Sequence, residues 1–242
     1  MNAAVGDQKA KRTPLKSLAD LIVIAAYLVV VPQLAEAAFV EAGLPTTGLT
    51  RILATGVIFA GLVAVVVVLL ALRGETLRDI GLQSPRNLAG AAALGVAVAA
   101  LTFAGLEALQ RLGVMGETRL GDMASELKGD LPLAFARAGL GLIVVGFVEE
   151  LLFRGFVLDR LAKAFGSGVL ALGGALAGQA ALFALAHAYQ GVEGMLFTGA
   201  VGLLFGIAFV AAGRNLWPVI IAHGVFDAAR AMHLYLVLTA AR

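Results

Sequence analysis

The sequence predicts an all-α protein, a polytopic transmembrane bundle of about seven helices, and three observations support this fold class. Of its 242 residues, 60% are hydrophobic and 14% are charged, whereas soluble domains average about 45–50% apolar and about 25% charged residues. Apolar stretches of about 20 residues, enough to cross a bilayer core, recur along the whole chain. The 30 glycines suit transmembrane helices that approach one another closely.

The charge and the cysteine content exclude several functional classes. The formal net charge is only +2, and the basic residues lie mainly in loops and near the ends, so we expect no nucleic-acid partner. The chain has no cysteine, which excludes disulfides, thiolate metal sites and a thiol nucleophile. This composition fits a protein that is embedded in the lipid bilayer.

The N-terminal half, residues 18–131, is predicted to hold three spans. A polar, basic segment precedes it, residues 1–17, which we interpret as a cytoplasmic tail. The three spans are expected at about 18–40, 49–72 and 88–112. The mixed, charged segment 113–131 is expected to form a short interfacial helix or a lid over a site.

The first apolar segment permits a second interpretation. A basic start, a short apolar core and Ala35-Glu36-Ala37 resemble a cleavable signal peptide. Apolar character resumes at Ala38-Phe39-Val40, so we favour a retained helix over cleavage within residues 1–37.

The C-terminal part, residues 132–240, is predicted to hold four further spans. Pro132 is a good first-turn residue, and Gly166-Ser167-Gly168 breaks the first of these spans. The spans are expected at about 132–165, 169–189, 195–212 and 215–238. Positive charge in the tail and at 73–86 and 154–163 favours a cytoplasmic position for these loops.

The most informative stretch runs from Glu149 to Arg154 and places two carboxylates and a guanidinium inside an apolar span. A charge at bilayer depth costs at least roughly 2.5–3.5 kcal/mol, so such residues indicate a functional site. Glu150 and Arg154 are four residues apart and are expected to pair on one helix face. Glu149 points about 100° away from that face, which makes it the better candidate for a general base.

Two histidines in later spans are the natural partners of these carboxylates. With a rise of about 1.5 Å per residue, Glu150, His187 and His223 are expected at similar depths, within about 10 Å of one another. Asp227 lies one turn after His223 and is expected to accept a hydrogen bond from the ring and fix its tautomer. Phe183, one turn before His187, is expected to wall one side of the pocket.

Structural roles for these residues remain open alternatives. A lone Glu–Arg pair can clamp a helix, and a lone intramembrane histidine more often bonds a neighbouring helix; His233 fits that second role. Glu107 is expected to snorkel or to pair with Arg111. Residues near span ends are expected to be solvated: Asp20, Glu36, Glu41 and Arg51. The convergence of two glutamates, two histidines and an aspartate on three spans favours a reactive site.

The order of these motifs resembles that of the CPBP family of intramembrane proteases, which includes CAAX prenyl proteases of the Rce type and bacterial Abi proteins. The resemblance covers roughly residues 132–230. It rests on three motifs and a closing segment: Glu149-Glu150-x-x-x-Arg154, Phe183-x-x-x-His187, His223-x-x-x-Asp227, and Phe205 to His223.

The resemblance implies an intramembrane endopeptidase whose catalytic helical core is residues 132–240. It would act on membrane-associated proteins or peptides, some of them prenylated at CAAX-type ends, and would lie in the bacterial cytoplasmic membrane. The catalytic residues that it implies are Glu149, Glu150, Arg154, His187, His223 and Asp227. Asp227 departs from the family pattern, in which asparagine is usual; only an asparagine amide can donate a hydrogen bond there.

Two mechanisms remain open. Glu149, His187 and His223 would supply the three protein ligands of a catalytic Zn²⁺. Without a metal, Glu149 would deprotonate water, and a histidine would stabilise the oxyanion or protonate the leaving amine. We favour the second mechanism.

Two non-proteolytic functions are the alternatives. A binding or immunity protein could keep the fold without hydrolysis, and Asp227 favours that interpretation. A proton-coupled transporter could also use glutamate and histidine relays, although the sequence shows no inverted repeat or paired broken helices.

Overall fold

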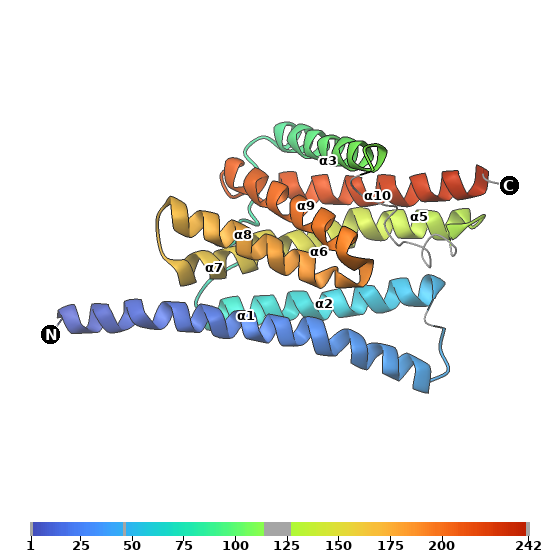
Figure 1. Ribbon diagram of the computed structural model, residues 1–242. Coiled ribbons are helices and arrows are strands. Elements are labelled where there is room, and N and C mark those ends of the chain that lie inside the picture. Colours follow the sequence, from blue (N-terminus) through green and yellow to red (C-terminus); the bar gives the residue numbers. More distant parts are fainter. Residues whose placement is uncertain (1, 46, 114–126, 241–242) are drawn as a thin grey trace.

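The computed structural model describes residues 2–45, 47–113 and 127–240, and within these ranges all regular secondary structure is helical. Six helical segments are long and apolar enough to cross a membrane, which confirms the predicted all-α transmembrane bundle (Figure 1). Most of the expected interfacial segment, residues 114–126, lies outside the described ranges. The α-helices are α1 (Asn2–Glu41), α2 (Gly48–Leu72), α3 (Leu88–Arg111), α5 (Leu131–Gly139), α6 (Gly146–Glu150), α7 (Leu158–Phe165), α8 (Val169–Ala186), α9 (Gly191–Ala211) and α10 (Trp217–Ala240).

Helix α1 is longer than its apolar segment. It begins at Asn2 and includes the polar residues 2–17 that the sequence assigns to a tail. Ala, Lys, Gln and Arg in that stretch are good helix formers, and a helix that already exists extends at little cost. Pro32 lies inside α1, where it has no N–H to donate to the preceding turn.

The span Leu131–Phe165, here called the glutamate helix, carries the acidic motif. Asp130 caps its start by accepting a hydrogen bond from the Leu133 N–H at 2.9 Å, and it ends at Gly166, whose φ is 94°. Two π-helical segments, η1 (Leu140–Val145) and η2 (Leu151–Val157), flank the short α6. π-Helical turns are rare overall, but those that occur often lie at functional sites. Each such turn rotates the side chains that follow it.

Helix α10 lies between α3 and the glutamate helix (Figure 1). Glycines allow its backbone to approach η1 and α6 closely. A Cβ at Gly146 would lie 2.7 Å from the Gly224 nitrogen, and a Cβ at Gly224 would lie 2.5 Å from the Leu142 carbonyl oxygen. This close approach brings His223, the neighbour of Gly224, against the two glutamates.

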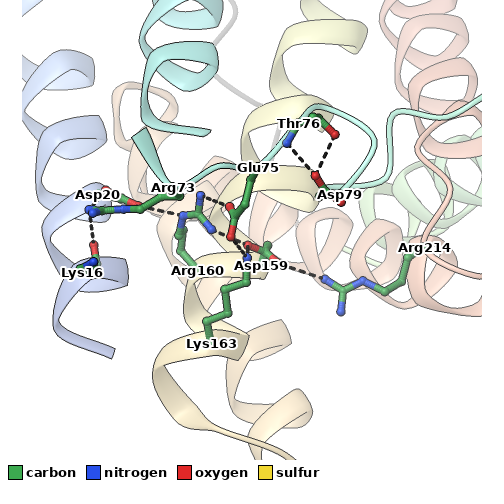
Figure 2. Close-up of polar contacts among 10 residues, drawn as sticks. All are labelled: Lys16, Asp20, Arg73, Glu75, Thr76, Asp79, Asp159, Arg160, Lys163 and Arg214. Carbon is green, nitrogen blue, oxygen red and sulfur yellow. Dashed lines mark hydrogen bonds and ion pairs between the residues drawn. The ribbon is translucent and has the colours of Figure 1, made fainter. Parts of the chain in front are cut away.

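A network of ion pairs ties the N-terminal helices to the glutamate helix at one end of the bundle (Figure 2). Its centre is Arg160, whose side chain is 2% exposed and pairs with Asp20 at 3.0 Å, Asp159 at 2.7 Å and Glu75 at 2.6 Å. Its guanidinium also lies over the Phe156 ring, 4.6 Å from the centroid. We call this the ionic cluster: Asp20, Arg73, Glu75, Asp159, Arg160, Lys163 and Arg214.

Asp20 corrects one expectation from the sequence. It was expected to be solvated near the end of its segment, but its side chain is only 2% exposed. Arg73 binds it with two nitrogens, Nη2 at 2.6 Å and Nε at 3.2 Å. The reason is the packing of α1 on α7, which covers Asp20 and replaces its water with guanidinium groups.

Candidate active site

Glu150, Arg154 and His223 form the buried base of the site. Glu150 Oε1 accepts hydrogen bonds from Arg154 Nη1 and from His223 Nδ1, each at 2.7 Å. Glu150 and Arg154 are fully buried and His223 is 6% exposed. The expected pairing of Glu150 with Arg154 is confirmed, and Glu150 also links the glutamate helix to α10.

Aromatic rings surround the guanidinium of Arg154. It lies 4.4 Å from the centroid of the Phe183 ring and 5.3 Å from that of Phe205, close enough for cation–π attraction. Its Nε and Nη2 are buried without a hydrogen-bond partner. The rings and Glu150 therefore supply the main stabilisation that holds this cation inside the bundle.

His187 ends α8 and turns toward the glutamates. Its Nδ1 lies 2.8 Å from the carbonyl oxygen of Phe183. Because a carbonyl only accepts hydrogen bonds, the proton of the neutral ring is on Nδ1, and Nε2 presents a lone pair. The Phe183 and His187 rings are 4.5 Å apart, so Phe183 does form one wall of the site.

Glu149 faces both histidines. Its Oε2 lies 3.7 Å from His223 Nε2 and 3.9 Å from His187 Nε2. These separations exceed hydrogen-bond length, and Oε2 is buried without a hydrogen-bond partner. Glu149 Oε2 and the two Nε2 atoms, each able to take part in a hydrogen bond, thus converge, and this arrangement suits a small polar molecule such as water.

Asp227 does not have its expected role. It was expected to fix the tautomer of His223, but Glu150 holds Nδ1 and thereby performs that function. Asp227 Oδ2 lies instead 3.6 Å from Nε2, beyond hydrogen-bond length. The reason is the orientation of the ring, which turns Nδ1 into the glutamate helix and leaves Nε2 facing the reactive side.

The residues expected to bind zinc lie slightly farther apart than the ligands of a bound zinc, and the zinc alternative stays a prediction. Within the described ranges, no group of three acidic, histidine or cysteine side chains is placed to hold a metal ion. Ligand atoms about 2.1 Å from a tetrahedral zinc lie about 3.4 Å apart, whereas Glu149 Oε2 lies 3.7 and 3.9 Å from the two histidine nitrogens.

Tyr189 is a residue that the sequence did not single out. It lies in a short 3₁₀ turn after His187, and the two rings are 5.9 Å apart. The charges of Glu149, Asp227 and Arg51 all act on its hydroxyl. Its position, two residues after a candidate catalytic histidine at a span end, is the signal that could have identified it.

His233, by contrast, packs on Phe103 with ring centroids 6.0 Å apart.

Comparisons with known proteins place these motifs in a family. Neither curated proteins nor solved structures gave a match to the chain. A family model does match, over residues 131–229, and this range includes the glutamate helix and every residue of the site described above except Arg51. The matched model is that of the type II CAAX prenyl endopeptidase Rce1-like family, and residues 131–229 of the chain are similar to it.

Proposed function

We propose that this protein is an intramembrane endopeptidase that hydrolyses peptide bonds of membrane-associated proteins or peptides, with Glu149 as the general base. The observation that carries the proposal is the convergence of Glu149 Oε2 and the Nε2 atoms of His187 and His223 within 3.7–3.9 Å. The family is one of proteases, and its description supports CAAX-type prenylated proteins as one substrate class. We further propose the bacterial cytoplasmic membrane as its location.

The two histidines differ in a way that assigns them different tasks. His187 Nδ1 is bonded to a neutral carbonyl, so its Nε2 lone pair can accept one hydrogen of the attacking water while Glu149 accepts the other. His223 Nδ1 is bonded to a carboxylate, with Glu149 and Asp227 near Nε2. These carboxylates stabilise the positive charge of an imidazolium, which can donate its Nε2 proton to the oxyanion.

The steps follow from these positions. Glu149 removes a proton from water as the water oxygen bonds to the scissile carbonyl carbon, and the carbonyl oxygen becomes an oxyanion that His223 stabilises. When the tetrahedral intermediate collapses, the C–N bond breaks and the proton held by Glu149 passes to the leaving amine. Glu150 and Arg154 hold His223 in place throughout.

The direct test compares the N- and C-termini of membrane proteins in cells that carry wild-type protein or Glu149→Gln at equal expression. Termini found only with the wild type would establish proteolysis and identify the substrate class. Because the amide cannot act as a base, we expect a loss of about 10²–10⁴-fold in their formation. Identical termini in both strains, with both proteins folded, would refute the proposal.

A binding or immunity protein is the second candidate, and Asp227 is the residue that favours it. A carboxylate near His223 Nε2 cannot donate to a substrate carbonyl, unlike the asparagine amide of the family pattern. In a binding protein, Glu149→Gln would leave function intact, so the same experiment separates the two.

A further inference from the structure

A groove opens between the second half of α1 and the first half of α2. The two helices meet where the Tyr27 hydroxyl donates a hydrogen bond to the Ile58 carbonyl at 2.7 Å, and they separate from there toward their connection (Figure 1). The space holds a cavity of about 400 Å³, within the range of ligand-binding pockets. We call it the α1–α2 groove; its lining is Pro32, Ala35, Glu36, Phe39, Pro45, Thr47, Thr50, Arg51, Ala54, Thr55 and Ile58.

The chemistry of this lining distinguishes a peptide from a lipid. Apolar residues alternate with hydroxyl groups, a carboxylate at Glu36 and a guanidinium at Arg51. Both walls belong to helices that are apolar and long enough to span a membrane. A lipid tail makes no hydrogen bonds to polar side chains, whereas an extended peptide has N–H and C=O groups that need partners where water is scarce.

Arg51 links the groove electrostatically to the candidate active site. The charge of Arg51 acts on the Tyr189 hydroxyl, as do those of Glu149 and Asp227. Helix α2 also packs along the glutamate helix, against α5, η1 and η2. A chain held in the groove therefore lies against α2, a helix that itself packs on the glutamate helix.

The two ends of α1 are held differently. Asp20, in the first half of α1, forms ion pairs with Arg73 and Arg160 in the ionic cluster. Beyond Tyr27 the helix carries exposed apolar side chains such as Val29, Leu34 and Val40, and Pro32 weakens its hydrogen-bond ladder. One wall of the groove is therefore anchored by the ionic cluster at a distance from the cavity.

We propose that the α1–α2 groove binds an extended peptide segment of the membrane-associated substrate next to the bond that is cut. This inference rests on the proposed proteolytic function and adds a docking site outside the residues that match the family. The groove supplies apolar surface for side chains and hydroxyl, carboxylate and guanidinium groups for the peptide backbone and its polar ends.

The first test fills the groove. Ala54→Trp places an indole in it, while Val57→Trp adds the same indole to the same helix at a site that is 73% exposed and does not line the groove. We expect Ala54→Trp to reduce formation of the Glu149-dependent termini by about tenfold or more, a difference of about 1.4 kcal/mol, and Val57→Trp to leave it unchanged. Equal activity of the two variants would overturn the proposal.

The second test identifies the occupant without requiring turnover. The chain has no cysteine, so Ala54→Cys or Val57→Cys can be labelled uniquely with benzophenone maleimide in the Glu149→Gln background and irradiated in cells. Support would be peptide adducts at position 54 from proteins whose termini depend on Glu149, with lipid adducts at position 57. Lipid adducts alone at position 54, or peptides unrelated to those termini, would overturn the groove proposal. The absence of any Glu149-dependent terminus would instead refute the proteolytic function.

Discussion

At the scale of single residues, the site is arranged by hydrogen bonds that orient two rings in different ways. His187 Nδ1 is bonded to a backbone carbonyl and His223 Nδ1 to the Glu150 carboxylate, so two identical side chains have partners of different charge. Arg154 donates a hydrogen bond to Glu150, and its own guanidinium lies over the rings of Phe183 and Phe205. In the proposed mechanism, Glu150 and Arg154 therefore position the reacting groups, and Glu149 reacts.

Asp227 offers a test at this scale. Replacing Asp227 with asparagine removes a carboxylate near His223 Nε2 and supplies an amide N–H able to bond a substrate oxyanion. We expect Asp227→Asn to raise the cleavage rate by roughly tenfold or more, because a single oxyanion donor is worth about 10²–10³-fold and Glu149 and Glu150 remain to stabilise the His223 imidazolium. The measurement is the rate at which Glu149-dependent termini appear. A fall in rate would show that the carboxylate itself is needed.

At the scale of elements, the loop after α2 is held to α7 by Glu75. Its carboxylate receives hydrogen bonds from Arg160 and Lys163, each at 2.6 Å. Partial burial of Glu75 opposes ionisation, but these bonds outweigh that cost and hold the pKa of the Glu75 carboxyl below its usual value. The bonds therefore join two elements in a way that depends on pH.

The sign of this dependence follows from the lowered pKa. The stability contributed by Glu75 is fully present above the unfolded pKa of about 4.3 and is lost as the pH falls through the lower folded pKa. We expect thermal unfolding in detergent to show a steeper loss of stability below about pH 4.3 for wild-type protein than for Glu75→Gln. Parallel curves for the two proteins would contradict this role.

The positions of the spans could be predicted from the sequence, but the π-helical segments and the burial of Asp20 could not. Apolar length placed the spans, and four-residue spacing placed Glu150 beside Arg154. The π-helical segments η1 and η2 were not predicted. Apolar residues lie on all sides of that span, so their spacing carries no signal of a wider turn. Asp20 was misjudged because its position near a segment end says nothing of the helix that packs over it.

At the scale of the whole molecule, the ionic cluster joins parts of the chain that differ in family resemblance. Asp20, Arg73 and Glu75 precede the matched range, whereas Asp159, Arg160 and Lys163 lie within it. Glu75 and Arg160 are 85 positions apart, so no local pattern could predict their pairing. Ion pairs as well as apolar packing therefore hold the N-terminal helices against the family-matched range.

Arg160 tests this connection. Arg160→Met removes the guanidinium from three carboxylates, and Asp20 stays buried with only Arg73 as its partner. Breaking a buried ion pair on one side typically costs about 3–5 kcal/mol, so we expect a clear fall in Tm. Arg86→Met, at an exposed position, is the matched control. An equal Tm for both variants, measured in the same detergent, would contradict the assigned role.

The glycines between the glutamate helix and α10 determine how the protein tolerates mutation as well as how its helices pack. Gly146 and Gly224 leave no room for a methyl group where the two backbones meet, and His223 directly precedes one of them. Even alanine at either position would push the histidine away from Glu150. Two residues without any reactive group are therefore expected to be as intolerant of substitution as the carboxylates that they help to position.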